Sequence, residues 1–408
     1  MNEKRILIVT KNLLDMSDAQ SQQSFALINA LSDSGYSLDI VTAKSRVSSS
    51  DKLPALRNIR LFVLPASWHA YGNSLVQKIQ RKLYRSMASI IQSKWSSNAA
   101  RIISELCKEN DYSAIISIAL PMESHLAVFN TNIRPQLWIA CMSDPWPESI
   151  LPRPYADFSI PLVSLAQKKV VGKVLQSADH LVFTCKEQLD FMKRHYSFIS
   201  ETNSSVIPHI ASIFQISARK NHGEFVITHC GSLSRERVCP GLASALSMLP
   251  DRSAVVINFI GNVNEEMKHE FERNGVSDRI KYTGSLDKER AMEMASESDA
   301  LLLIEADMQE YPFLPSKLAD YSAASLPIMA ITGENSASAK LILSHNCGVI
   351  CGHDPNAILN AILSIETGKF RPSSELHDYF CSVNVAEMYE IILHSRTPGD
   401  SDEYNQAR

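Results

Sequence analysis

A short stretch after an apolar run at residues 300–304 combines the side chains that a phosphorylated, hydroxyl-rich ligand requires. The run itself is typical of a buried parallel strand. Pro315 would fit the first turn of a helix, where its missing N–H costs nothing. On that helix Ser316, Lys317 and Asp320 would share one face, so that the helix dipole and the ammonium attract phosphate while the carboxylate accepts hydrogen bonds from sugar hydroxyls. The alternative is a serine that caps the helix and a solvated lysine–aspartate pair.

Length and composition indicate a folded protein of two domains. At 408 residues the chain is too long for one ordinary hydrophobic core. Hydrophobic residues make up 45% and charged residues 21%, which favours a globular enzyme over a disordered chain. The formal net charge of −4 gives no overall attraction to nucleic acid, so we expect no nucleic-acid partner.

Cysteine usage and the length of the apolar runs bear on the compartment. The eight cysteines form no Cys-x-x-Cys pair, which argues against a zinc site or a disulfide framework and favours reduced thiols. The first apolar run, residues 6–9, is too short for a signal peptide. No run approaches the roughly 18 apolar residues that span a bilayer. We therefore expect a cytoplasmic protein.

Alternating strand and helix patterns predict an α/β fold with two doubly wound, Rossmann-like domains that face a cleft. Strands are expected at residues 5–10, 38–42, 59–64, 114–119, 137–140 and 180–184, and again at 225–230, 255–260, 280–283, 301–304, 328–331 and 348–350. The resulting divisions are a domain at 1–216, a linker at 217–223, a second domain at 224–375, a terminal helix at 376–396 that crosses back, and a disordered tail at 397–408.

Polar residues follow several of the predicted strands. Ligands of open α/β sheets bind outside the carboxyl ends of the strands, so these residues would face a binding cleft. They are Ser143 and Asp144, Lys186 and Glu187, and His209. The loop after the first strand lacks Gly-x-Gly-x-x-Gly, which gives no support for a nicotinamide dinucleotide.

A basic amphipathic helix is predicted at residues 75–95, flanked by Trp68 and Tyr71 and closed by Trp95. One stripe of this helix is apolar and the rest is rich in lysine and arginine. Such a helix would lie on an anionic membrane, or it would pack on its own domain; the pattern leaves both interpretations open. Three lysines on the predicted helix at 162–176 would extend the same basic surface: Lys168, Lys169 and Lys173.

The second half carries a series of motifs in a specific order. The series is Gly231-Ser232-Leu233 with Arg237, Phe259-Ile260-Gly261, Tyr282 to Leu286, Asp299 to Ile304, Phe313 to Tyr321, and Leu326-Pro327-Ile328. It resembles the donor-binding domain of GT-B-fold glycosyltransferases, in particular the large retaining family 4. Segments similar to the acceptor domain of that family are Ser143 to Trp146, Ser177 to Val182 and Val206 to His209.

The resemblance implies roles for individual residues. Arg237 and Lys317 would neutralise the diphosphate that leaves during transfer, and Asp320 would hold the ribose hydroxyls of a nucleotide sugar. No set of metal ligands is visible, so fixed positive charge and a helix N-terminus would stabilise the leaving group without a divalent ion. The catalytic candidates are Arg237, Lys317, Glu310 and Asp144. The residues expected to bind the nucleotide sugar are Gly231, Ser232, Arg237, Gly284, Ser285, Leu286, Pro315, Ser316, Lys317, Leu318 and Asp320.

One acidic position departs from the family pattern. The family has two acids eight residues apart, but eight residues before Asp320 stands Pro312. Glu310, Asp307 and Glu305 are the alternatives for the first carboxylate, and Glu310 is favoured.

These observations predict a metal-independent, retaining glycosyltransferase without a cofactor. Its nucleoside-diphosphate sugar would be a co-substrate, and its acceptor a glycan or lipid-linked glycan of the bacterial cell surface. Asp144 and His125 are candidates for orienting the acceptor, and an ordinary histidine at a helix start is the alternative for His125. Contact with an anionic membrane at the inner face of the cell membrane follows from one of the two interpretations of the basic helix. The alternatives are a non-catalytic partner protein of the same fold and a nucleotide-sugar epimerase, which demands acid–base groups beside the sugar.

Overall fold

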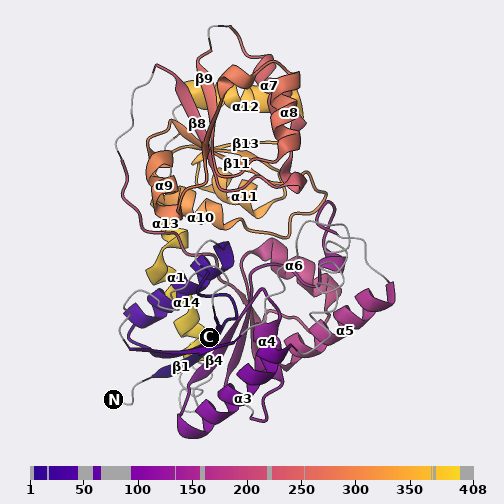
Figure 1. Ribbon diagram of the computed structural model, residues 1–408, viewed down its shortest axis with the longest axis vertical. Coiled ribbons are helices and arrows are strands. Elements are labelled where there is room, and N and C mark those ends of the chain that lie inside the picture. Colours follow the sequence, from indigo (N-terminus) through magenta and orange to yellow (C-terminus); the bar gives the residue numbers. More distant parts are fainter. Residues whose placement is uncertain are drawn as a thin grey trace, which may run out of the picture. The chain divides into compact units, whose positions relative to one another are not determined.

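The structure is a computed structural model of the chain, and it divides the chain into two compact units, each built on its own parallel sheet (Figure 1). The first unit comprises Met1–Leu151, Ala156–Pro208 and Ser382–Arg408, and the second comprises Pro152–Tyr155 and His209–Cys381. The residues that the structure describes are 4–15, 18–44, 58–65, 93–133, 135–156, 161–217, 223–251, 253–368, 370 and 374–395. The predicted basic helix at 75–95 lies outside them apart from its last residues.

The first sheet has the strand order β3-β2-β1-β4-β5-β6-β7, and every neighbouring pair is parallel. Its strands are β1 (Arg5–Val9), β2 (Ser37–Ala43), β3 (Ile59–Leu64), β4 (Ala114–Ala119), β5 (Trp138–Met142), β6 (His180–Phe183) and β7 (Ser204–Val206). The predicted strands agree with these apart from short shifts at the ends. Strand β7 is new, because its three residues, Ser-Ser-Val, are too few and too polar to show a strand pattern.

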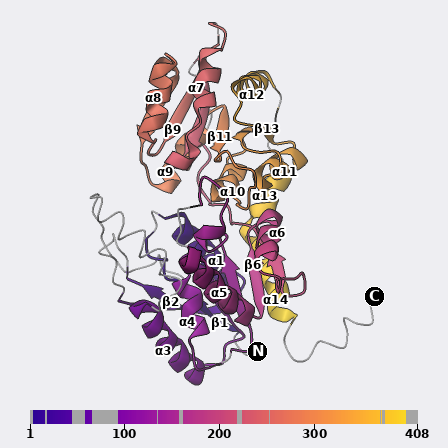
Figure 2. The ribbon, with the colours of Figure 1, turned by 90° about the vertical axis from the view of Figure 1, so that its right-hand side faces the viewer.

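Helices cover both faces of the first sheet (Figures 1 and 2). They are α1 (Ala19–Asp33), α3 (Lys94–Glu109), α4 (Glu123–Phe129), α5 (Pro161–Ser177), α6 (Lys186–His195) and α14 (Ser382–His394), with a 3₁₀ turn η1 (Glu148–Ile150). α3, α4 and α5 pack against one face, and α1 packs with α14. Trp95, the last residue of the predicted basic helix, is 2% exposed in this core.

The second sheet has the order β10-β9-β8-β11-β12-β13 and is also parallel throughout. Its strands are β8 (Phe225–Cys230), β9 (Val255–Ile260), β10 (Ile280–Gly284), β11 (Ala300–Ile304), β12 (Ile328–Ile331) and β13 (Gly348–Cys351). All six were predicted to within a residue at each end. The predicted fold class, α/β with two Rossmann-like sheets, is confirmed.

The helices of the second unit also lie on both faces of its sheet (Figures 1 and 2). They are α7 (Pro240–Ser247), α8 (Glu265–Arg273), α9 (Lys288–Ser296), α10 (Ser316–Ala323), α11 (Ala337–Ser344), α12 (Pro355–Thr367) and α13 (Ser374–Phe380), with 3₁₀ turns η2 (Arg235–Arg237) and η3 (Ser277–Arg279). The core between β8, β9 and the helices α7, α8 and α12 is apolar and almost fully buried.

The chain passes between the units at different places from those expected. It enters the second unit at His209, before the expected linker, because the backbone N–H groups of Ser212 and Ser217 donate to side chains of that unit. The expected terminal helix is two helices. α13 ends at Phe380 within the second unit, and α14 crosses back to the first, where the Tyr389 hydroxyl lies 3.3 Å from the Cys141 sulfur.

Candidate functional site

The centre of the second sheet is a topological switch point. β8 and β11 are neighbours, yet the chain leaves β8 toward β9 and β10 and leaves β11 toward β12 and β13. Connections that diverge in this way open a crevice at the carboxyl ends of the two strands, where ligands of α/β sheets bind. Gly231 directly follows β8, and the segment after β11 leads to α10. The predicted site residues of the second unit therefore gather at one edge of one sheet.

Two glycines shape the backbone at this edge. Gly231 has φ +92° and Gly261, which follows β9, has φ +135°, a region that other residues rarely adopt. A Cβ atom on Gly261 would lie 2.6 Å from the carbonyl carbon and oxygen of Gly231, so the two loops pack backbone against backbone. A Cβ atom on Gly231 would lie 3.1 Å from Cε of Lys317. Because residue 231 is a glycine, the Lys317 side chain can pack directly against the backbone of the loop.

Lys317 is held by a buried histidine that the sequence analysis did not identify. The Nζ of Lys317 lies 3.0 Å from Nε2 of His229, and Nδ1 of His229 lies 2.9 Å from the carbonyl oxygen of Leu302. A carbonyl only accepts, so the hydrogen bonds assign the proton to Nδ1 and leave Nε2 to accept from the ammonium. Burial and the nearby Lys317 charge hold the pKa of His229 well below its ordinary value. The only sequence feature that could have indicated this role is a histidine near the end of a largely apolar strand.

The site has an excess of positive charge. Burial, and then the charge of Arg237, lower the pKa of Lys317 to about 7, against a small opposing effect of Cys230. Arg237 lies on η2, where its Nε donates to the Tyr155 hydroxyl at 3.1 Å. Within the described part of the chain, no carboxylate forms an ion pair with Arg237 or Lys317. An anion that bound beside both cations would relieve their mutual repulsion.

Helix α10 begins one residue later than predicted. Pro315 precedes the helix with extended backbone, φ −61° and ψ 125°, so Ser316 rather than Pro315 opens the first turn. Leu318 is fully buried under the helix. Tyr321 joins the two central strands, because its hydroxyl accepts from the Cys230 N–H at 2.9 Å and donates to the Leu302 carbonyl at 3.2 Å. The helix that carries Lys317 is therefore fixed to the ends of both strands.

Asp320 lies on the same helix but has its own partners. One oxygen lies 2.9 Å from Nζ of Lys288, and the other accepts from the Ser212 N–H at 3.1 Å. The side chain is nearly buried. The charges of Asp320 and Lys317 both act on the Cys230 thiol, so the two side chains lie near the same strand end.

The three acids considered for the first carboxylate differ in their surroundings. Glu305 follows β11 directly and is 4% exposed. It accepts a hydrogen bond from the Ser338 hydroxyl at the start of α11, and burial raises its pKa to about 7. Asp307 and Glu310 are exposed in the loop that leads to α10. The structure therefore places Glu305 in the packed interior and the other two at the surface.

The remaining candidates of the second unit lie at the exposed ends of strands. Ser232 follows Gly231 and is exposed. Gly284, with φ +81°, ends β10, and Ser285 and Leu286 follow it at the surface. β10 is the edge strand beyond β9, so these three residues lie at the same carboxyl edge as Gly231, two strands away.

In the first unit, the two acceptor candidates differ. Asp144 follows β5 and is partly exposed, beside Ser143, whose hydroxyl donates to the Ala119 carbonyl at 2.8 Å. His125 is fully buried, with Nδ1 2.7 Å from the Ser117 hydroxyl, and burial lowers its pKa to about 3. Of the two alternatives for His125, burial favours the structural histidine, because its ring lies in the core of the unit.

Two searches of the described residues concern metals and membranes. No group of three or more His, Cys, Asp or Glu side chains among them is arranged to hold a metal ion. No helix among them combines the length and the apolarity needed to cross a bilayer. None of the eight cysteines, all of which lie among the described residues, forms a disulfide bond.

Comparisons with solved structures identify the fold. A sucrose-phosphate synthase from Thermosynechococcus elongatus is 14% identical, with 96% of each chain covered and a TM-score of 0.67. A glycosyltransferase from Rickettsia africae is 12% identical, with 98% of this chain and 100% of that chain covered and a TM-score of 0.67. Anabaena HepE in complex with UDP-glucose is 12% identical, with 96% and 99% covered and a TM-score of 0.63. Neither the models of known protein families nor the curated protein sequences give a match. The chain therefore has the GT-B fold.

Proposed function

We propose that the chain is a glycosyltransferase that moves a sugar from a nucleoside-diphosphate donor to an acceptor hydroxyl. The observation that carries this proposal is the pair of cations, Arg237 and Lys317, beside the exposed backbone of Gly231 at the switch point. A diphosphate carries the charge that this site lacks. The structures with the same fold support the assignment, since HepE was solved with UDP and with UDP-glucose.

The site favours a leaving diphosphate more than a neutral sugar. Negative charge develops on the diphosphate as the glycosidic bond breaks, and preorganised donors at that point lower the barrier. Lys317 and Arg237 supply charged donors, and the first turn of α10 supplies backbone N–H groups with the positive end of the helix dipole. Because the cations are fixed by His229 and Tyr155, they need little reorganisation during the reaction.

The finer assignments of this proposal follow the family resemblance. The second unit binds the donor, with Gly284 to Leu286 beside the base, and the first unit binds the acceptor, with Asp144 orienting its hydroxyl. The transfer retains the anomeric configuration and needs neither metal nor cofactor, as in family 4. The acceptor is a glycan or a lipid-linked glycan of the bacterial cell surface.

A second candidate function is a non-catalytic partner protein of the same fold. One observation favours it: both carboxylate oxygens of Asp320, the acid expected to hold the ribose, already have partners in Ser212 and Lys288. Such a protein would bind nucleotide weakly or not at all.

A donor screen tests the proposal. Thermal unfolding of the full chain is measured with UDP-, GDP-, ADP- and TDP-sugars, because a ligand that binds only the folded state raises Tm. We expect one nucleotide class to raise Tm and to release nucleoside diphosphate when an acceptor glycan extract and a chelator are added. Binding without release would favour the non-catalytic partner. A flat response to all four donors would contradict both the donor site and the transferase assignment.

A further inference from the structure

Helix α5 of the first unit presents an outward stripe that none of the described residues of its own domain covers. Val171, Val174 and Leu175 pack into the core on the inner face of the helix. On the outer face, Leu162 is 78% exposed and Leu165 is 66% exposed. Exposed leucines on one helix are costly in water unless a second surface covers them. These two residues open the stripe, and polar residues continue it.

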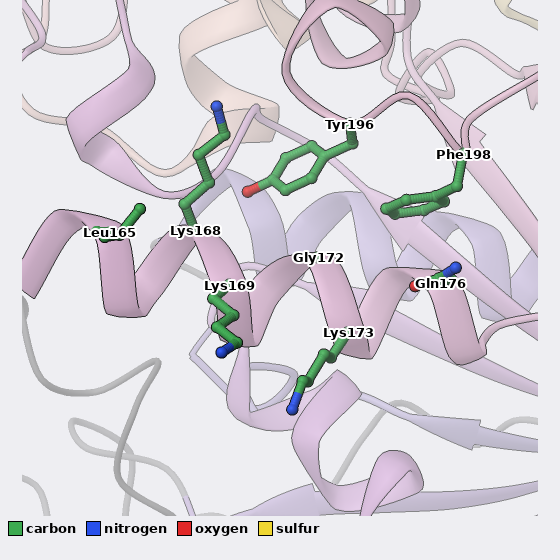
Figure 3. Close-up of a pocket in the computed structure, with 8 residues that line it drawn as sticks. All are labelled: Leu165, Lys168, Lys169, Gly172, Lys173, Gln176, Tyr196 and Phe198. Carbon is green, nitrogen blue, oxygen red and sulfur yellow. The ribbon is translucent and has the colours of Figure 1, made fainter.

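The same stripe becomes cationic toward the end of the helix. Lys169 and Lys173 follow Leu162 and Leu165 at helical spacing, and both lysines are exposed. The helix contains no aspartate or glutamate, so nothing on it neutralises these charges. In Figure 3 the side chains of Lys169 and Lys173 extend to the same side of the helix. We call Leu162, Leu165, Lys169 and Lys173 the outer stripe.

A shallow cleft of about 380 Å³ lies beside the outer stripe (Figure 3). Its lining residues are Leu165, Lys168, Lys169, Gly172, Lys173, Gln176, Tyr196 and Phe198. Tyr196 forms a fixed wall, because its ring packs on the helix where Gly172 has no side chain and its hydroxyl donates to the Trp146 carbonyl at 3.3 Å. Three lysines contribute to the lining of the cleft, together with aromatic and aliphatic side chains. This combination fits a phosphate group attached to an apolar body.

We propose that the outer stripe and its cleft dock the first unit on an anionic lipid surface. The leucines enter the boundary between headgroups and acyl chains, and the lysines bind the phosphates of the headgroups. A soluble polyanion would use the lysines but leave the leucines in water, so the leucines single out a lipid surface. The proposal does not depend on the donor site, because α5 belongs to the first unit and lipid binding needs no nucleotide sugar.

Flotation of the full chain with vesicles tests the proposal. One set of vesicles contains phosphatidylglycerol in phosphatidylcholine, and the other contains phosphatidylcholine alone. We expect the protein to float with the first set only. Replacing Lys168, Lys169 and Lys173 together by glutamine should weaken this binding by roughly 100-fold, since each lysine near an anionic surface contributes about one factor of five. Replacing Leu162 and Leu165 by glutamine should weaken it by about tenfold or more without changing the net charge.

A charge-matched control separates the stripe from the net charge of the protein. Arg273 and Lys340 are exposed and Lys268 is partly exposed on helices of the second unit, and their replacement by glutamine removes the same three charges. We expect this control to float like the wild type, and circular dichroism to show that all variants are folded. No flotation of the wild type, an equal loss in the control, or full binding by the leucine variant would each overturn the proposal.

Discussion

Each sheet has a topological switch point, but the charged side chains at the two switch points are arranged differently. In the first unit the switch point lies between β1 and β4, where Lys11 follows β1 and Glu123 opens the helix after β4. The two side chains form an ion pair at 2.7 Å, and both are almost fully buried. In the second unit the corresponding helix carries Lys317 as its second residue, and this lysine faces a neutral histidine. At the first switch point the lysine is paired with a glutamate. At the second, the lysine faces a histidine and not a carboxylate.

The difference in pairing indicates a structural role for the first switch point and a binding role for the second. In a buried ion pair each charge is compensated by its partner, so neither is available to bind a ligand. Lys11 also donates its backbone N–H to the Ser124 hydroxyl at 3.0 Å, which ties the loop after β1 to α4. At the second switch point Lys317 and Arg237 repel each other, and an anion that bound beside both would relieve this repulsion. We therefore expect the second switch point, rather than the first, to bind an anion.

The largest expected effect is on stability, at the first switch point. Glu123→Gln leaves the Lys11 ammonium buried without its counter-charge, and we expect it to lower the free energy of unfolding by about 3–5 kcal/mol. Urea denaturation measures this change. Glu105→Gln removes an exposed acid whose partner is Arg101, and it should change stability by less than about 1 kcal/mol. Equal effects of the two substitutions would show that the ion pair is not a structural element of the first switch point.

The second effect is on turnover. Lys317→Met removes the ammonium from the Gly231 loop while keeping an unbranched side chain of similar length. We expect the turnover number to fall by about 100-fold or more, as when one preorganised donor to a developing charge is lost. Stability should not fall, because burial disfavours the charged form of this lysine. A steady-state assay with the donor that the thermal screen selects gives the rate.

Lys281→Met provides the control for this substitution. Lys281 is an exposed lysine of the same unit that pairs with Glu224. Its removal changes the net charge equally but leaves the switch point intact. A similar loss of turnover in both variants would show that the positive charge acts over the whole unit rather than at the switch point.

The elements of both sheets, apart from strand β7, were readable from the sequence because apolar runs, glycines and helix patterns report local preferences. The location of Lys317 beside Gly231 was inferred from a resemblance rather than from the spacing itself. What the sequence did not reveal were contacts between distant residues. His229 follows Thr228 near the end of a largely apolar strand, and only the fold shows that it faces Lys317. Asp320 was expected to face a ligand, but its partner Lys288 lies 32 positions earlier in the chain.

The third effect concerns pH. Because the pKa of free Lys317 lies at about 7, the lysine is charged below that pH and loses its charge as the pH rises through it. A bound diphosphate favours the ammonium and raises this pKa. Donor affinity should therefore be highest below pH 7 and fall by up to about tenfold for each pH unit above it, until the pKa of the complex is reached. Calorimetric titration between pH 6 and 9 measures the profile, with roughly one proton taken up on binding at the upper end.

Two variants sharpen this prediction. In Lys317→Met the fall in affinity above pH 7 should disappear, because the titrating group is gone. In His229→Leu the ammonium loses the nitrogen that accepts its hydrogen bond, so its pKa should drop further and the fall should begin at lower pH. If His229→Leu does not change the pH dependence of donor affinity, then the histidine does not influence the pKa of Lys317. A profile that survives in Lys317→Met would assign the titration to another group and remove the charge contrast between the two switch points.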